Sequence, residues 1–185
     1  MSPSIQLLKN RYLKHIKENP DLFVGIELEF PIVHTDGKPT DIEVSKELMC
    51  FLVKALNLEV ERRDKEGNPI QLLEAFSQDR ILFEVSYTTL EFAFGRARSI
   101  QEIESRFETY MKVIQRKLGE KDHAIQGWGI HPNWDINDNR PVAYPRYQML
   151  MDYLSMGSHQ ESAHFHDFPQ YGAFICGSQV QLDVS

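Results

Sequence analysis

Two glutamates in the segment 24–30, VGIELEF, have the spacing needed to share one face of a strand. Successive side chains of a β-strand point to opposite faces, so Glu27 and Glu29 lie together and their apolar neighbours face the other way. Adjacent carboxylates repel each other and are costly in a central strand unless solvent, a cation or a metal compensates. Since Mg²⁺ prefers carboxylate oxygens, the pair could hold Mg²⁺ with bound phosphates. A solvated acidic face explains the same pattern.

The last segment of the chain, 177–185, repeats this alternation with amides. Gln179, Gln181 and Asp183 share one face, and valine and leucine side chains share the other. Amide and carboxylate oxygens can coordinate a hard cation or hold a zwitterionic substrate by hydrogen bonds. We therefore take Gln179 as a candidate metal ligand and Gln181 and Asp183 as candidate cofactor-binding residues. A half-exposed strand with a polar face is the alternative.

Two further glutamates lie midway along the chain. Glu84 stands between Phe83 and Val85 and should face away from them across a strand, and Glu91 follows in the next strand-like segment. A surface carboxylate on an edge strand accounts for Glu91 equally well.

The segments that must position these residues alternate between helical and strand patterns. Ser99 and Glu102 form a capping box before one long apolar stripe, and Ser45 is a plausible N-cap for an earlier helix. Clustered strands separated by helices predict an α+β fold with a mainly antiparallel sheet packed on helices, in one domain over residues 1–185. We expect helices at 4–18, 45–58, 99–118 and 146–154, and strands at 22–33, 59–65, 70–76, 80–86, 88–94, 124–131 and 173–184.

The composition excludes several classes of protein. A formal charge of -7 does not suit nucleic-acid or anionic-membrane binding, because both need clustered lysine and arginine. No apolar run is long enough to cross a membrane, and the N-terminus lacks the apolar core that a signal peptide needs. Cys50 and Cys176 lack the spacing of a metal site, and we predict two reduced thiols in a cytoplasmic protein. Oligomeric state cannot be predicted.

Taken together, the chain resembles the glutamate–cysteine ligase family, especially its plant-type branch. Five short segments carry the resemblance in the family's order: GIELE at 25–29, EVSYTTLE at 84–91, GWGIHPNW at 127–134, PRYQMLMDYL at 145–154 and SQVQLDVS at 178–185.

The resemblance implies a glutamine synthetase-like fold, in which a curved, mainly antiparallel sheet binds ATP and Mg²⁺ or Mn²⁺ on its inner face. It places Glu27, Glu29, Glu84 and Gln179 among the metal ligands and Arg146 near the transferred phosphoryl group. The substrates would be glutamate, cysteine and ATP. The γ-carboxylate would first form a γ-glutamyl phosphate, from which the cysteine amine displaces phosphate. Without the resemblance to the family, Arg146 would be interpreted as a helix N-terminal residue in a surface ion pair that contributes little energy.

The sequence also departs from the family pattern. The family continues beyond the strand that ends this chain, so we expect a fold incomplete at the C-terminus and no ligation by the 185 residues alone. An extra stretch carries His159, His164 and His166, which we interpret as polar loop residues since their spacing is not that of a zinc protease. A non-catalytic module of this fold, and a ligase acting on another amine, are the alternative functions.

Overall fold

The computed structural model describes residues 2–14, 16–156, 168 and 170–183. The elements in chain order are helix α1 (Pro3–Leu13), strand β1 (Val24–His34), helix α2 (Ile42–Ala55), strands β2 (Glu59–Arg63), β3 (Pro69–Leu73), β4 (Arg80–Phe83) and β5 (Thr89–Ala93), helix α3 (Ile100–Gly119), strand β6 (His123–Ile125), helix α4 (Pro145–Met156), the 3₁₀ helix η2 (Tyr171–Ala173) and strand β7 (Ser178–Leu182).

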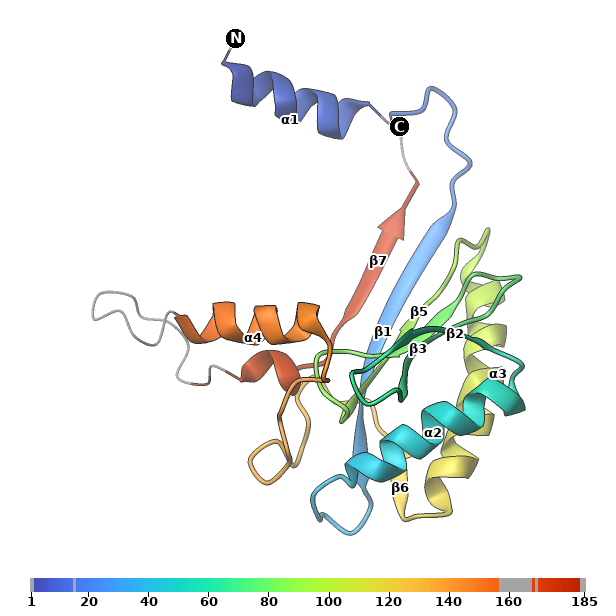
Figure 1. The fold of residues 1–185 in the computed structure, drawn as a ribbon. Helices are drawn as coiled ribbons and strands as arrows, with labels where there is room; N and C mark the ends of the chain where they lie inside the picture. Colours follow the sequence, from blue (N-terminus) through green and yellow to red (C-terminus); the bar gives the residue numbers. More distant parts are fainter. Residues whose placement is uncertain (1, 15, 157–167, 169, 184–185) are drawn as a thin grey trace.

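Within the described residues, the seven strands form one open antiparallel sheet of order β2-β3-β4-β5-β1-β6, and β7 also pairs with β1. The long strand β1 organises the sheet (Figure 1), because one of its edges pairs with β5 and the other pairs with β7 and then with β6. The predicted class, α+β with a mainly antiparallel sheet packed on helices, is confirmed. The closer likeness to glutamine synthetase stays a prediction.

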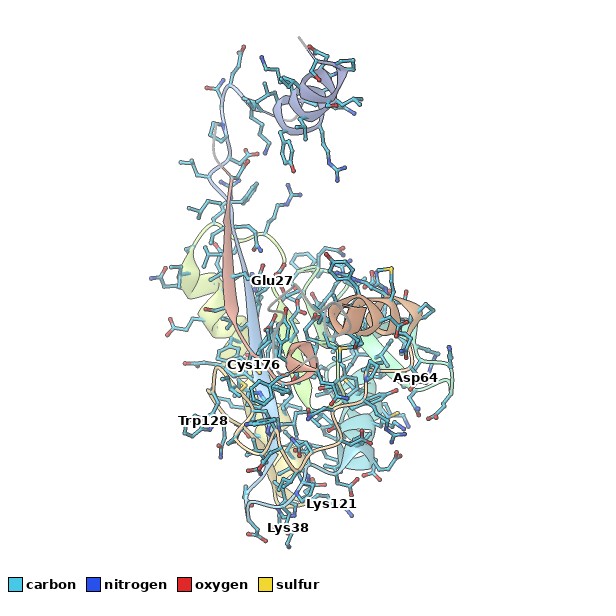
Figure 2. The ribbon with its side chains drawn as sticks, turned by 90° about the vertical axis from the view of Figure 1, so that its left-hand side faces the viewer. Glu27, Lys38, Asp64, Lys121, Trp128 and Cys176 are labelled. Carbon is cyan, nitrogen blue, oxygen red and sulfur yellow. The ribbon has the colours of Figure 1, made fainter. Side chains whose placement is uncertain are left out.

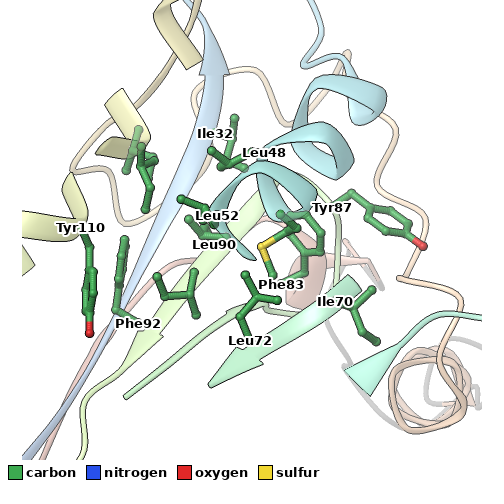
Figure 3. Close-up of a cluster of buried hydrophobic side chains, with 14 of the residues drawn as sticks. Ile32, Leu48, Leu52, Ile70, Leu72, Phe83, Tyr87, Leu90, Phe92 and Tyr110 are labelled. Carbon is green, nitrogen blue, oxygen red and sulfur yellow. The ribbon is translucent and has the colours of Figure 1, made fainter. Parts of the chain in front are cut away.

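One face of the sheet forms the hydrophobic core with helices α2 and α3. Leu48 and Leu52 of α2 pack toward Leu72, Phe83 and Leu90 of the strands (Figure 3), and all five are fully buried. Each strand residue of this face alternates with a residue of the opposite face, so the core face is apolar while the other is free to carry polar groups.

The boundaries of several elements differ from the predicted ones. The N-cap of α2 is Asp41, whose carboxylate accepts from the Glu43 N–H, and Ser45 is buried one turn into the helix, so the Ser45 prediction is wrong. The strands from β2 to β7 are all shorter than expected, and the difference is largest at β6, which ends at Ile125, and at β7, which begins only after the turn of η2. The α3 prediction is confirmed, since Ser99 Oγ accepts from the Glu102 N–H.

Helix α1 lies apart from the rest of the chain, beyond the ends of β1 and β7 (Figure 1), and none of its residues is buried. It ends at Leu13, five residues before the predicted end, and Lys17 then pairs with Asp183 after β7 at 2.9 Å. Over the described part of the chain, no helix combines the length and apolar character that crossing a membrane requires.

Candidate functional site

A cavity of about 530 Å³ lies against the polar face of the sheet. Two cross-strand rows make up its floor. The register pairs Gln71 with Leu82, Leu82 with Glu91 and Glu91 with Glu29, which gives the first row. The second row runs Arg80, Ala93, Glu27, Gln179. All eight residues line the cavity, because the strand period of two places every second residue on this face.

The half of the cavity over β1, β5 and β7 is acidic. Glu27 and Glu29 project from β1, Glu91 from β5, and Glu84 from the turn after β4, where it keeps the facing of Arg80 and Leu82. Gln179 lies opposite Glu27 on the neighbouring strand. Figure 2 shows Glu27 on the upper part of β1, far from Lys38 and Lys121 at the other end of the molecule. Across the described residues, none of the four glutamates forms an ion pair.

Burial, together with the neighbouring carboxylates, raises the pKa of two of these glutamates. Burial is the main cause that raises the pKa of Glu91 to about 8, and Glu84 adds to it through a hydrogen bond and its negative charge. Burial also raises the pKa of Glu29, although the Gly177 N–H, which donates to Glu29 Oε2 at 2.7 Å, opposes the shift. Both carboxyls therefore gain from a cation that enters the cavity.

The opposite half, over β2, β3 and β4, carries arginines and an amide. Arg80 donates to both oxygens of Glu61, at 2.8 and 3.0 Å, and Gln71 donates to the same carboxylate. Strand β2 is irregular here: Val60 pairs with Leu72, but Arg62 pairs with Gln71, so Glu61 is an extra residue. This bulge explains why the consecutive residues Glu61 and Arg62 both line the cavity.

Helix α4 borders the cavity with its first turn. The Tyr147 hydroxyl donates to the Phe83 carbonyl oxygen at 2.8 Å and also lies 3.4 Å from Glu84 Oε2. Burial, followed by the charges of Glu84 and Glu91, raises the pKa of Tyr147, which therefore stays protonated. The exposed Arg146 precedes it and lines the cavity.

The structure brings together five of the seven predicted site residues. Glu27, Glu29, Glu84, Gln179 and Arg146 all line the one cavity.

The two remaining residues lie outside the cavity, one on β7 and one just after it. Gln181 is opposite Gly25 and is not among the cavity residues, and Asp183 is held by Lys17 and by the Asp21 N–H. The loop histidines 159, 164 and 166 lie outside the described residues.

Several cavity residues were not predicted from the sequence. Glu61 and Arg62 lie on β2, whose alternating charged residues have the pattern of a solvated edge, whereas Gln71 and Arg80 lie on the short and mostly buried strands β3 and β4. The only local signal is the polar Gln71 inside the otherwise apolar segment PIQLL, because a buried amide needs a hydrogen-bond partner.

The donor set suits a hard divalent cation in its chemistry, since it offers carboxylate and amide oxygens and two carboxyls that burial keeps from ionising freely. The arrangement is open, however. In the described ranges no three histidine, cysteine, aspartate or glutamate side chains are gathered closely enough to form a metal site. A cation there would need the side chains to turn inward.

Comparison with protein-family models finds none that matches the chain, and comparison with curated proteins finds no match. Membership of the glutamate–cysteine ligase family therefore stays a prediction from the short motifs.

Proposed function

We propose that the cavity binds Mg²⁺ or Mn²⁺ with ATP, and that the chain is part of a ligase joining the γ-carboxylate of glutamate to the amine of cysteine. One observation carries the proposal: four half-buried glutamates and a glutamine, from β1, β5, β7 and the end of β4, face one cavity without a paired cation in the part of the chain described. Like charges held this close are costly, so a divalent cation would be bound with a gain in stability.

In the proposed reaction, the protein positions the substrates and stabilises charge. Glu27, Glu29, Glu84 and Gln179 would hold the cation, which would supply positive charge to the ATP phosphates. Arg146, across the cavity, would carry charge toward the transferred phosphoryl group. The γ-carboxylate of glutamate attacks the γ-phosphorus and ADP leaves; the cysteine amine then displaces phosphate, and its proton goes to solvent.

Cys176, which lies near Glu29, is not a nucleophile in the proposed reaction. Burial raises the pKa of the Cys176 thiol to about 12, so it stays protonated at neutral pH. Both cysteines are free, as predicted, and the proposal includes a cytoplasmic location.

The glutamine synthetase-like fold belongs to the same proposal. An open antiparallel sheet with helices on one face and a polar cavity on the other supports it.

The test is binding of Mn²⁺, followed by electron paramagnetic resonance, with and without ATP. We expect Glu27→Gln and Glu29→Gln each to weaken Mn²⁺ binding at least tenfold, because each removes a charged ligand and keeps the shape of the side chain. Thermal unfolding of both variants should occur at or above the wild-type temperature, because repulsion is relieved.

Glu102→Gln is the matched control. It removes the same charge from an exposed side chain of the α3 cap, and glutamine also serves that cap. Mn²⁺ binding at wild-type strength in both cavity variants would show that these carboxylates are only a polar strand face.

A non-catalytic module of the same fold is the second candidate. The open arrangement of the carboxylates favours it, since no three are gathered at ligand distances among the described residues. ADP release from ATP by the full-length protein, in the presence of glutamate and Mg²⁺, distinguishes the two, and only the ligase would show it. Replacing cysteine by other amines in the same assay would show whether the acceptor differs.

A further inference from the structure

The floor of the cavity changes character from one end to the other. At the β1, β5 and β7 end lie four unpaired carboxylates, and at the β2 and β3 end lie Arg62, Gln71 and Glu61, whose carboxylate is already paired with Arg80. Between them the two rows place Leu82 and Ala93, the only apolar lining residues among those described. Neighbouring strands are ~5 Å apart, so the apolar strip separates the two polar ends by one to two strand spacings.

Among the described residues, the Arg62 guanidinium is held less tightly than that of Arg80, although its charge acts on the neighbouring Glu61. The cavity's other β-strand arginine, Arg80, donates two hydrogen bonds to the Glu61 carboxylate, one to each oxygen. Arg62 forms no such ion pair in the described chain, and its guanidinium lies 5.7 Å from the centre of the Tyr144 ring. A half-buried guanidinium without a carboxylate partner is a ready site for an anion.

The position of Arg62 depends on the bulge in β2. A regular register would pair Glu61 with Gln71 and turn Arg62 to the other face, whereas the extra residue places Arg62 opposite Gln71 on the cavity side. Arg63, the next residue, instead donates to the Gly67 carbonyl oxygen and is not a cavity residue. Bulges beside functional sites commonly re-aim one side chain in this way.

We propose that Arg62, with Gln71 beside it, binds the α-carboxylate of a dicarboxylic amino acid whose methylenes lie on Leu82 and Ala93 and whose second carboxylate reaches the acidic end. This inference rests on the proposed function, because it takes the acidic end as the place of reaction. The planar guanidinium fits a carboxylate with two parallel hydrogen bonds, and the apolar strip suits a short aliphatic spacer.

The test compares two ligands that differ only in the α-carboxylate: L-glutamate and 4-aminobutanoate. Each is titrated into the isotope-labelled chain with Mg²⁺ present and followed by nuclear magnetic resonance shifts. We expect the wild-type chain to prefer glutamate at least tenfold, and Arg62→Gln to reduce that preference to about twofold by weakening glutamate alone.

Arg63→Gln is the matched control, with the same loss of charge one residue away and the preference retained. A preference that survives in Arg62→Gln, or no preference in the wild-type chain, overturns the inference. So does an Arg62→Gln chain that loses affinity for tripolyphosphate while keeping the glutamate preference, because the guanidinium would then serve phosphate.

Mn²⁺ binding to the same Arg62→Gln chain separates this inference from the proposed function. Retained Mn²⁺ binding with an unchanged glutamate preference means that only the inference fails. Absence of Mn²⁺ binding in the wild-type chain removes the proposed function, while the glutamate comparison, repeated without Mg²⁺, still decides the role of Arg62.

Discussion

Two groups of carboxylates in this protein have opposite surroundings. Asp79, 2% exposed, accepts from Arg106 at 2.6 Å, from the Tyr110 hydroxyl at 2.8 Å and from the Gly95 N–H at 2.8 Å. The four glutamates in the acidic half of the cavity, Glu27, Glu29, Glu84 and Glu91, have one another as neighbours and form no ion pair within the described residues. Burial is tolerated in the first group because each oxygen has donors, and in the second it raises the pKa of Glu91 instead.

The difference shows what each group does. Asp79, in the loop before β4, accepts from Gly95 just after β5 and from Arg106 and Tyr110 of α3, and therefore ties these elements together. Asp64 does the same for the β2–β3 turn, where Asn68 and the Tyr87 hydroxyl donate to it. Glu29 and Glu84 also accept from distant residues, Gly177 and Tyr147, but no cation pairs with either carboxylate among the described residues, so the repulsion within the cluster is not offset as it is at Asp79.

The largest expected effect comes from Asp79. Asp79→Asn removes the charge that pairs with Arg106 and leaves that guanidinium partly buried without a counter-ion. Breaking one side of such a pair should lower the free energy of unfolding by about 3 kcal/mol, measured by urea denaturation. Asp36→Asn, at an exposed pair with Lys38, is the control and should change it by less than ~0.5 kcal/mol. Equal effects of the two changes would break the comparison.

Asp64 should give a smaller effect, and that effect should shrink in acid. Burial alone would raise its pKa, but hydrogen bonds from Asn68, Tyr87 and the backbone together hold the pKa below its usual value of 3.8. The unfolded chain therefore binds the proton first, and the stability that Asp64 contributes is present above pH ~4 and lost as the pH falls through the folded-state value. Asp64→Asn should cost ~1 kcal/mol at pH 6 and less at pH 3, in urea unfolding at both values. A constant difference would contradict this.

Glu91 should give an effect about as small as that of Asp64, with the opposite sign and the opposite dependence on pH. Its pKa rises from 4.5 to about 8 on folding, so the folded chain binds the proton more tightly and stability falls as the pH rises between those values. Glu91→Gln should remove this decline and stabilise the chain by ~1 kcal/mol at pH 8, measured by thermal unfolding from pH 5 to 8. A wild-type chain that is more stable than the variant at pH 8 would show that burial and repulsion at the cavity glutamates do not destabilise the fold.

Local patterns were enough to predict much of this protein. The alternation in 24–30 and around Glu84 placed the glutamates on the polar face, and Ser99 with Glu102 marked the start of α3, because strand period and helix capping depend on neighbours in the chain. The α+β class followed from the same periodicities.

Only the tertiary structure decided which strands meet. The register that sets Glu27 opposite Gln179 joins segments some 150 residues apart, and no local preference specifies such a pairing. The bulge that turns Arg62 to the cavity depends on β3, and the burial that shifts the pKa of Glu91 depends on its central place between β4 and β1. The sequence therefore determined which face of its strand each predicted glutamate occupies, and long-range pairing determined its neighbours and charge, because burial and register are properties of the assembled sheet.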